Sequence, residues 1–226
     1  MSTSIPKSAF TFLNKLKKNN HRDWMQANKK EYQANEKALK EFYAEIENGL
    51  NQNDEIEKVK VFRINRDIRF SKDKTPYNVH RSVSYSRAGA HRRGGYYLRI
   101  EPGKTAVAGG FFGPEPPDLL RIRKEFEMDS NEIRKILAQK DFDKAFGGFV
   151  QEYAVKTAPK GFSKEDPNID LIRLKSFFVV REFSDEEALS KDFAKVVLKH
   201  YELMRPFFDY MSEVLTTDLN GVSTID

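Results

Sequence analysis

Hydrophobic residues in the first third of the chain follow a helical period. Residues 12–16 make a short amphipathic turn, and from Trp24 to Leu50 apolar side chains recur at the three- and four-residue spacing of one helix face. The segment "NNHRD" before Trp24 is typical of a helix start, with Asn20 as the N-cap residue. Asn28 lies in register between apolar positions, so we expect its side chain to be partly buried and to act as a structural anchor.

The middle of the chain changes to a period of two. In "FRINRDIRFS" (62–71), apolar and polar residues alternate, which predicts a half-buried strand. The segments "SVSYS" (82–86), "YYLRIEP" (96–102) and "TAVAGGFFG" (105–113) predict further strands, separated by polar turns. Because no helical pattern lies between these strands, we expect an antiparallel meander.

The last part of the chain returns to a helical pattern. "SDEE" (184–187) has the spacing of a capping box, and apolar residues from Phe193 to Leu215 predict a long amphipathic helix that is kinked or broken near Pro206. The sequence thus predicts a single α+β domain over residues 1–226. In this fold class a central antiparallel sheet, a meander, is flanked by N-terminal and C-terminal helices.

Composition narrows the classes of function. The chain has no cysteine, which excludes disulfides, thiolate nucleophiles and thiolate metal sites. No apolar run approaches the roughly 20 residues of a membrane span, and the N-terminal residues lack a secretory signal pattern. We therefore expect a cytoplasmic protein without a membrane partner. The four histidines lie far apart in no metal-binding frame, so we expect neither a metal nor another cofactor.

Positive charge is concentrated in one window. Residues 60–99 hold 11 Lys and Arg against two Asp, whereas the whole chain has a net charge of only +5. A locally basic segment suggests an anionic partner close to it. The alternative is that several of these arginines pair with acids that the fold brings to them.

The basic window divides into residues of different expected roles. Strand alternation places Arg66 on the apolar face, where an unpaired guanidinium would be costly, so Arg66 is expected to be a structural anchor. Cations on the opposite face and in the following "SKDKTPY" turn could grip phosphate or carboxylate groups. These candidate anion-binding residues are Arg63, Arg69, Lys72, Lys74 and Arg81.

Three functions remain open from these residues. The first is binding of an anionic, phosphate-containing ligand, with nucleic acid as one version. The second is a metal-independent hydrolase or transferase acting on a phosphorylated or carboxylated substrate, with Asp67, Asp73 and His80 as candidate acid–base groups. The third is a structural or protein-interaction module, which Arg66 pairing with an acid and Asn28 bonding to the "SKDK" backbone would favour. The sequence leaves the oligomeric state open.

Two motifs carry a resemblance to a known family. The N-terminal pattern "FL..L..NN.R.W...NK..Y" begins at Phe12, and the central pattern "R..RD.RFSKDK.PY" runs from Arg63 to Tyr77. With shorter "GG...P" and "P.GF" patterns, the chain resembles, over about residues 8–212, a family of conserved hypothetical proteins of bacteria and fungi, a domain of unknown function. The resemblance implies no reaction, substrate or cofactor.

Overall fold

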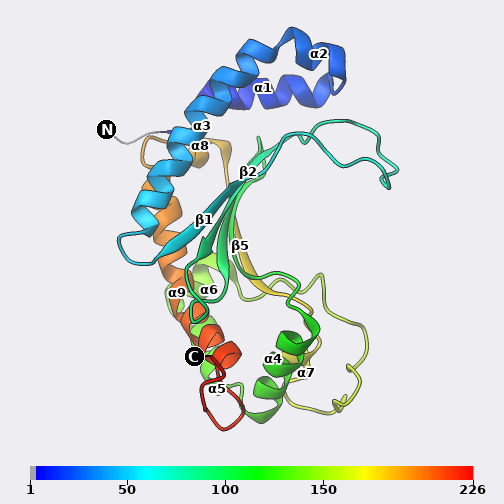
Figure 1. Ribbon diagram of the computed structural model, residues 1–226, viewed down its shortest axis with the longest axis vertical. Helices are drawn as coiled ribbons and strands as arrows, with labels where there is room; N and C mark the ends of the chain where they lie inside the picture. Colours follow the sequence, from blue (N-terminus) through cyan, green and yellow to red (C-terminus); the bar gives the residue numbers. More distant parts are fainter. Residues whose placement is uncertain (1–3, 226) are drawn as a thin grey trace. The chain divides into compact units, whose positions relative to one another are not determined.

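A computed structural model describes residues 4–225 of the chain (Figure 1). These residues form helices at both ends of the chain and between the last two strands. The helices are α1 (Lys7–Lys18), α2 (Arg22–Ala27), α3 (Lys29–Leu50), α4 (Pro116–Met128), α5 (Asn131–Leu137), α6 (Lys140–Phe146), α7 (Ile169–Ile172), α8 (Asp185–Ala188) and α9 (Phe193–Thr216). No helix within residues 4–225 combines the length and the apolar character that a bilayer crossing requires.

Five strands form one antiparallel sheet in which spatial neighbours follow the order of the chain. They are β1 (Ile56–Val61), β2 (Arg81–Arg87), β3 (Gly95–Ile100), β4 (Thr105–Phe111) and β5 (Phe177–Phe183). The predicted α+β class, with a central antiparallel meander and helices before and after it, is confirmed. Strands β2, β3 and β4 match the three later segments that the sequence predicted as strands.

The predicted strand over residues 62–71 is wrong. The first strand, β1, ends at Val61, and residues 62–80 form a long loop with one isolated bridge. Alternation reflects burial only as far as Arg69, because the next side chain, Phe70, is exposed rather than turned to an apolar face. The Asp67 carboxylate accepts from the Arg69 amide, and such a local bond competes with ladder formation.

The chain divides into two compact units, and each is described by itself. The first takes in the described residues of Met1–Tyr85, Tyr97–Val107 and Glu182–Lys199. In this unit the Phe42 ring stacks on Phe193 with the ring centres 6.1 Å apart, and the Tyr85 hydroxyl donates to the Tyr43 carbonyl over 3.1 Å. Helix α3 also contacts α1 and α2, so it joins the N-terminal helices to the core. The prediction of a single domain stays a prediction.

The second unit takes in the described residues of Ser86–Tyr96, Ala108–Arg181 and His200–Asp226. Its core is aromatic, with Tyr96 packed against Tyr201 and Phe208 at centre distances of 4.7 and 4.9 Å. Gly109 faces this core, where a Cβ atom would lie 2.4 Å from the sulfur of Met204. A larger residue at this position would therefore have to displace the Met204 side chain.

Local signals near the C-terminal helix had mixed outcomes. The capping box at Ser184 and Glu187 is present, although it opens the short helix α8 rather than α9. The helix was predicted to be kinked or broken near Pro206; a break is wrong, because α9 runs through this residue, and a kink stays a prediction. Proline removes a backbone donor and its ring crowds the carbonyl four residues earlier, but the buried side chains of Phe207 and Phe208 hold the helix in place against these costs.

Candidate anion-binding site

The candidate site is the connection between β1 and β2, residues 62–80, which we call the basic loop. It holds five Lys and Arg against two Asp. Its two limbs run antiparallel and pair at Asn65 and Tyr77. The Arg66 amide donates to the Pro76 carbonyl over 2.9 Å, and the Asn78 amide donates to the Ile64 carbonyl over 2.7 Å. In Figure 1 the loop projects from the ends of β1 and β2 on the side of α2.

The base of the basic loop is held by apolar contact with the N-terminal helices. Ile64 is buried in a cluster of side chains from α1 and α2, and Tyr77 packs against the same cluster. The other buried members are Phe12, Leu13, Leu16 and Met25. Burial of an Ile-sized side chain contributes about 1.5–3 kcal/mol, so this contact fixes where the loop leaves the sheet.

Asn20 supplies the polar half of the same attachment. Its side-chain amide donates to the Tyr77 carbonyl over 2.8 Å, and its side-chain oxygen accepts from the Tyr77 amide over 3.1 Å. The sequence predicted Asn20 as the N-cap of α2, and this prediction is wrong. His21 caps the helix instead, because its Nδ1 accepts a hydrogen bond from the Trp24 amide. The sequence offered no signal for this pairing, because the two residues lie 57 positions apart.

Asn28, the predicted anchor, makes a different contact. It lies between α2 and α3 and donates to the Trp24 carbonyl over 2.8 Å. This bond is local to the helix, and no bond joins the Asn28 side chain to the basic loop within residues 4–225. The bond from Asn28 to the "SKDK" backbone that would have favoured a structural module is therefore absent from the described residues, and Asn20 holds the loop at Tyr77 instead.

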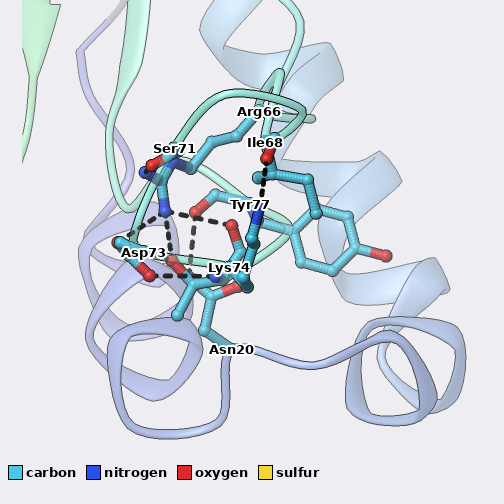
Figure 2. A network of polar contacts seen from close by, with 8 residues as sticks. Asn20, Arg66, Ile68, Ser71, Asp73, Lys74 and Tyr77 are labelled. Carbon is cyan, nitrogen blue, oxygen red and sulfur yellow. Dashed lines mark hydrogen bonds and ion pairs between the residues drawn. The ribbon is translucent and has the colours of Figure 1, made fainter.

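Arg66 organises the tip of the basic loop. Its guanidinium donates to the Asp73 carboxylate over 2.6 Å, to the Thr75 carbonyl over 3.0 Å and to the Thr75 hydroxyl. A longer bond of 3.4 Å reaches the Ser71 hydroxyl. Figure 2 shows Arg66, Ser71 and Asp73 turned toward one another between the two limbs. Arg66 pairs with an acid, as an anchor would, but it does so inside the loop and not on the apolar face of a strand.

Lys74 also bonds within the loop. Its ammonium group donates to the Ile68 carbonyl over 2.9 Å and lies 3.5 Å from the Arg69 carbonyl. Figure 2 shows Lys74 on the inner side of the loop, between Asp73 and Tyr77. This cation is therefore engaged by backbone oxygens that water would otherwise solvate.

Both aspartates of the loop are engaged by arginines. Asp67 accepts two bonds from the Arg69 guanidinium, over 3.0 and 2.7 Å, and one from the Arg69 amide. The side-chain and backbone bonds from Arg69 lower the pKa of Asp67, and the charge of Arg63 adds to this effect. A general acid or base needs a pKa near the working pH and must be able to reach the reacting atom. Because both aspartates are paired with arginines, the hydrolase or transferase hypothesis loses its main support.

The remaining candidates at the end of the loop are partly or fully buried. Burial lowers the pKa of His80, so this histidine is neutral at pH 7. The Arg81 side chain is only 5% exposed and donates to both carboxylate oxygens of Glu36, over 2.5 and 2.7 Å. Arg81 thus ties β2 to α3 and does not face solvent with the loop.

Ion pairs consume much of the positive charge of the wider window. At least six of its 11 basic residues pair with acids, each within one of the two units. The pairs are Arg66–Asp73, Arg69–Asp67, Arg81–Glu36, Arg87–Asp209, Arg93–Asp118 and Arg99–Glu182. The alternative interpretation of the basic window therefore accounts for most of its arginines.

Two cations of the basic loop differ from these. The side chains of Arg63 and Lys72 are exposed and make no hydrogen bond or ion pair with residues 4–225. Arg69 is paired, yet its side chain is 76% exposed, and its Nη1 group makes no hydrogen bond within the same residues. Of the five predicted anion contacts, these three keep donors directed to solvent. The described residues contain no group of three or more His, Asp or Glu placed to hold a metal ion.

The tip network makes the loop sensitive to acid. The amide and hydroxyl of Thr75, followed by Arg66, hold the pKa of Asp73 below its usual range. Because the carboxyl pKa is lowered, the bonds to Asp73 are fully formed at pH values above the ordinary carboxyl pKa of about 3.9. They are lost as the pH falls through the lowered pKa. We expect the NMR shift of the Thr75 amide proton to titrate with a midpoint below that value. Asp73→Asn should abolish this titration, and a midpoint at or above the ordinary value contradicts the network.

Comparison with known proteins identifies the family of the chain. Residues 8–210 match the family described as conserved hypothetical protein (DUF2461). The chain belongs to this family, which confirms the expectation from the sequence motifs. Comparison with curated proteins gave no match. Comparison with solved structures gave none either.

Proposed function

We propose that the protein binds an anionic, phosphate-containing ligand through the exposed side of the basic loop. One observation carries the proposal: Arg63 and Lys72 present free cationic groups on a loop whose own acids are already paired. Neither side chain makes a hydrogen bond or an ion pair within residues 4–225, so the donors of both remain available to a ligand. Arg69 adds a planar guanidinium whose remaining donors suit phosphate oxygens.

The order of the loop also supports binding. Arg66 and Lys74 close the tip from inside, and Asn20 holds its base, so the exposed cations stand on a fixed backbone. A ligand that meets a fixed loop does not have to offset the entropy of ordering it. Lys74 and Arg81 are left out of the proposed contacts because the first bonds to carbonyls and the second is buried with Glu36.

The paired substitution Arg63→Gln/Lys72→Gln tests the proposal. Each lost phosphate contact should weaken binding and reduce the dependence of log K on log salt by about 1. We expect the affinity for inorganic polyphosphate at low salt to fall by at least about a hundredfold, since each of the two lost hydrogen bonds to a charged group contributes about 1.5–3 kcal/mol. Titration calorimetry at several salt concentrations measures both quantities.

The control is Lys37→Gln/Lys58→Gln, which removes the same charge from exposed positions on α3 and β1. At about 0.1 M salt this control should leave the affinity within about twofold, because charges separated by more than about 10 Å are largely screened at that ionic strength. Equal weakening in both variants, or no polyphosphate binding by the unmodified protein, would remove the proposal.

A second function, a structural or protein-interaction module, is favoured by the Arg66–Asp73 pair. Under this hypothesis the charges of the basic loop serve only to shape the loop. The Arg63→Gln/Lys72→Gln variant would then fold normally and bind its partners as the unmodified protein does. The same titration therefore separates the two functions.

A further inference from the structure

The tip of the basic loop carries an aromatic ring that no other part of the described chain covers. Phe70 is 96% exposed, whereas the next most exposed large hydrophobic side chain within residues 4–225, Val222, is 62% exposed. Aromatic side chains bury large apolar areas in protein cores and interfaces. A ring presented almost completely to water is therefore unfavourable for the free protein and indicates a contact made with something else.

The backbone on both sides of Phe70 is fixed from inside the loop. Before it, the carbonyls of Ile68 and Arg69 face the Lys74 ammonium group. After it, the Ser71 amide donates to the Ile68 carbonyl over 3.4 Å, and the Ser71 hydroxyl accepts from Arg66. Because its neighbours are held inward, the ring points outward on a preorganised turn.

Cations lie next to the ring. The guanidinium carbon of Arg69 is 5.9 Å from the centre of the Phe70 ring, within reach of a cation–π interaction. Lys72, one of the two free cations, follows two residues later. An exposed aromatic ring between cations matches a nucleic acid strand, in which a base with its π-face is flanked by phosphates.

We propose that Phe70 stacks on an unpaired base, so that the ligand of the basic loop is single-stranded nucleic acid. This inference rests on the proposed function, since Arg63 and Lys72 would contact the phosphates of the same strand. Stacking tolerates any base, so binding should show little sequence preference. The bases of a duplex already stack on one another, so Phe70 could stack on one only after two neighbouring base pairs are separated. This cost favours binding of a single strand over a duplex.

An anionic membrane surface fits the loop less well. Membrane binding by an interfacial segment scales with the apolar area that it inserts. Within residues 62–80, Phe70 is the one large hydrophobic side chain that is exposed, and Ile68 is partly buried. A single ring offers little area for insertion, whereas one ring is sufficient to stack on one base.

Fluorescence anisotropy of the full chain with a labelled oligothymidylate of about 12 nucleotides tests the inference. Phe70→Ala should weaken this binding by roughly five- to a hundredfold, the range measured for loss of one stacked base. Binding of inorganic polyphosphate, which has no bases, should stay within about twofold. Phe112→Ala removes another exposed ring, in the other unit, and is the matched control for the loss of a phenyl group.

Phe70→Trp supplies a direct signal for stacking. It should keep the affinity for oligothymidylate, and the new tryptophan emission should fall on binding, with the unmodified protein and its one tryptophan, Trp24, as the reference. An emission that stays constant at saturating oligothymidylate would contradict the stacked geometry.

The outcomes separate this inference from the proposed function. If Phe70→Ala binds oligothymidylate as tightly as the unmodified protein, while Arg63→Gln/Lys72→Gln loses both ligands, stacking is wrong and anion binding stands. If the unmodified protein binds neither ligand, both proposals fail. Equal loss of duplex binding in Phe70→Ala overturns the single-strand preference. Binding to phosphatidylserine vesicles that depends on Phe70, without oligothymidylate binding, overturns the choice of nucleic acid.

Discussion

Replacing Arg81 with methionine is expected to lower the free energy of unfolding by about 3–5 kcal/mol. The substitution leaves the Glu36 carboxylate, only 17% exposed, without the guanidinium that now donates two bonds to it. Burial by itself would lower the pKa of Arg81, but the hydrogen bond and charge of Glu36 raise it above the ordinary value. The pair is therefore an interaction on which β2 and α3 both depend. Urea unfolding monitored by circular dichroism measures the change.

A double-mutant cycle shows whether the cost comes from the unpaired charge. Arg81→Met/Glu36→Leu removes both partners and replaces them with apolar side chains of similar size. Because buried ion pairs are often replaced at little cost, we expect the double variant to recover most of the stability lost in Arg81→Met. If the double variant is as unstable as the sum of the single variants, the ion pair is not what Arg81 contributes.

Gly110→Ala is expected to cost more than about 4 kcal/mol, a value reached only by the most disruptive substitutions. Gly110 has a φ of +145°, and a Cβ atom there would lie 2.2 Å from the Phe177 carbonyl oxygen and 2.5 Å from the Phe178 Cα. Backbone atoms of the adjacent strand β5 cannot move aside as a side chain can. The substitution therefore forces β4 and β5 apart, and thermal unfolding measures the loss.

Gly103→Ala provides the matched control for backbone strain. Gly103 also has a positive φ, +77°, but no atom lies within 4 Å of the position of its Cβ. Its cost should be limited to about 1–2 kcal/mol for the left-handed conformation. A similar loss in both variants would mean that the clash with β5 does not determine the effect at Gly110.

The sequence predicted the parts of the fold that repeat a local pattern. Alternating residues marked β2 and β3, a tight turn marked the start of β4, and the three- and four-residue spacing marked the helices at both ends. Strand β1 was missed because its six residues, "IEKVKV", carry lysines and show only partial burial, as edge strands often do. The alternating pattern continues through residues 62–71, so a strand was predicted there. Alternation alone does not show that side chains of this segment bond within their own loop.

The candidate site depended on contacts that no local pattern records. The pairing of Arg81 with Glu36 spans 45 positions, and that of Asn20 with Tyr77 spans 57. Spacing could identify Arg66 as a residue that requires an acid, but not which acid would meet it. The exposure of Phe70 was also missed, because an alternating pattern assigns a phenylalanine to the buried face.

The two sets of bonds in the basic loop differ in the length of chain that each must close. Arg66 reaches Asp73 and Thr75 over seven and nine positions, whereas Asn20 reaches Tyr77 over 57. Short closures cost less entropy and form faster than long ones. We expect the tip to assemble early in folding as a local turn. The base would close only when the N-terminal helices dock, so a nascent chain would present the finished tip before the rest of the protein is complete.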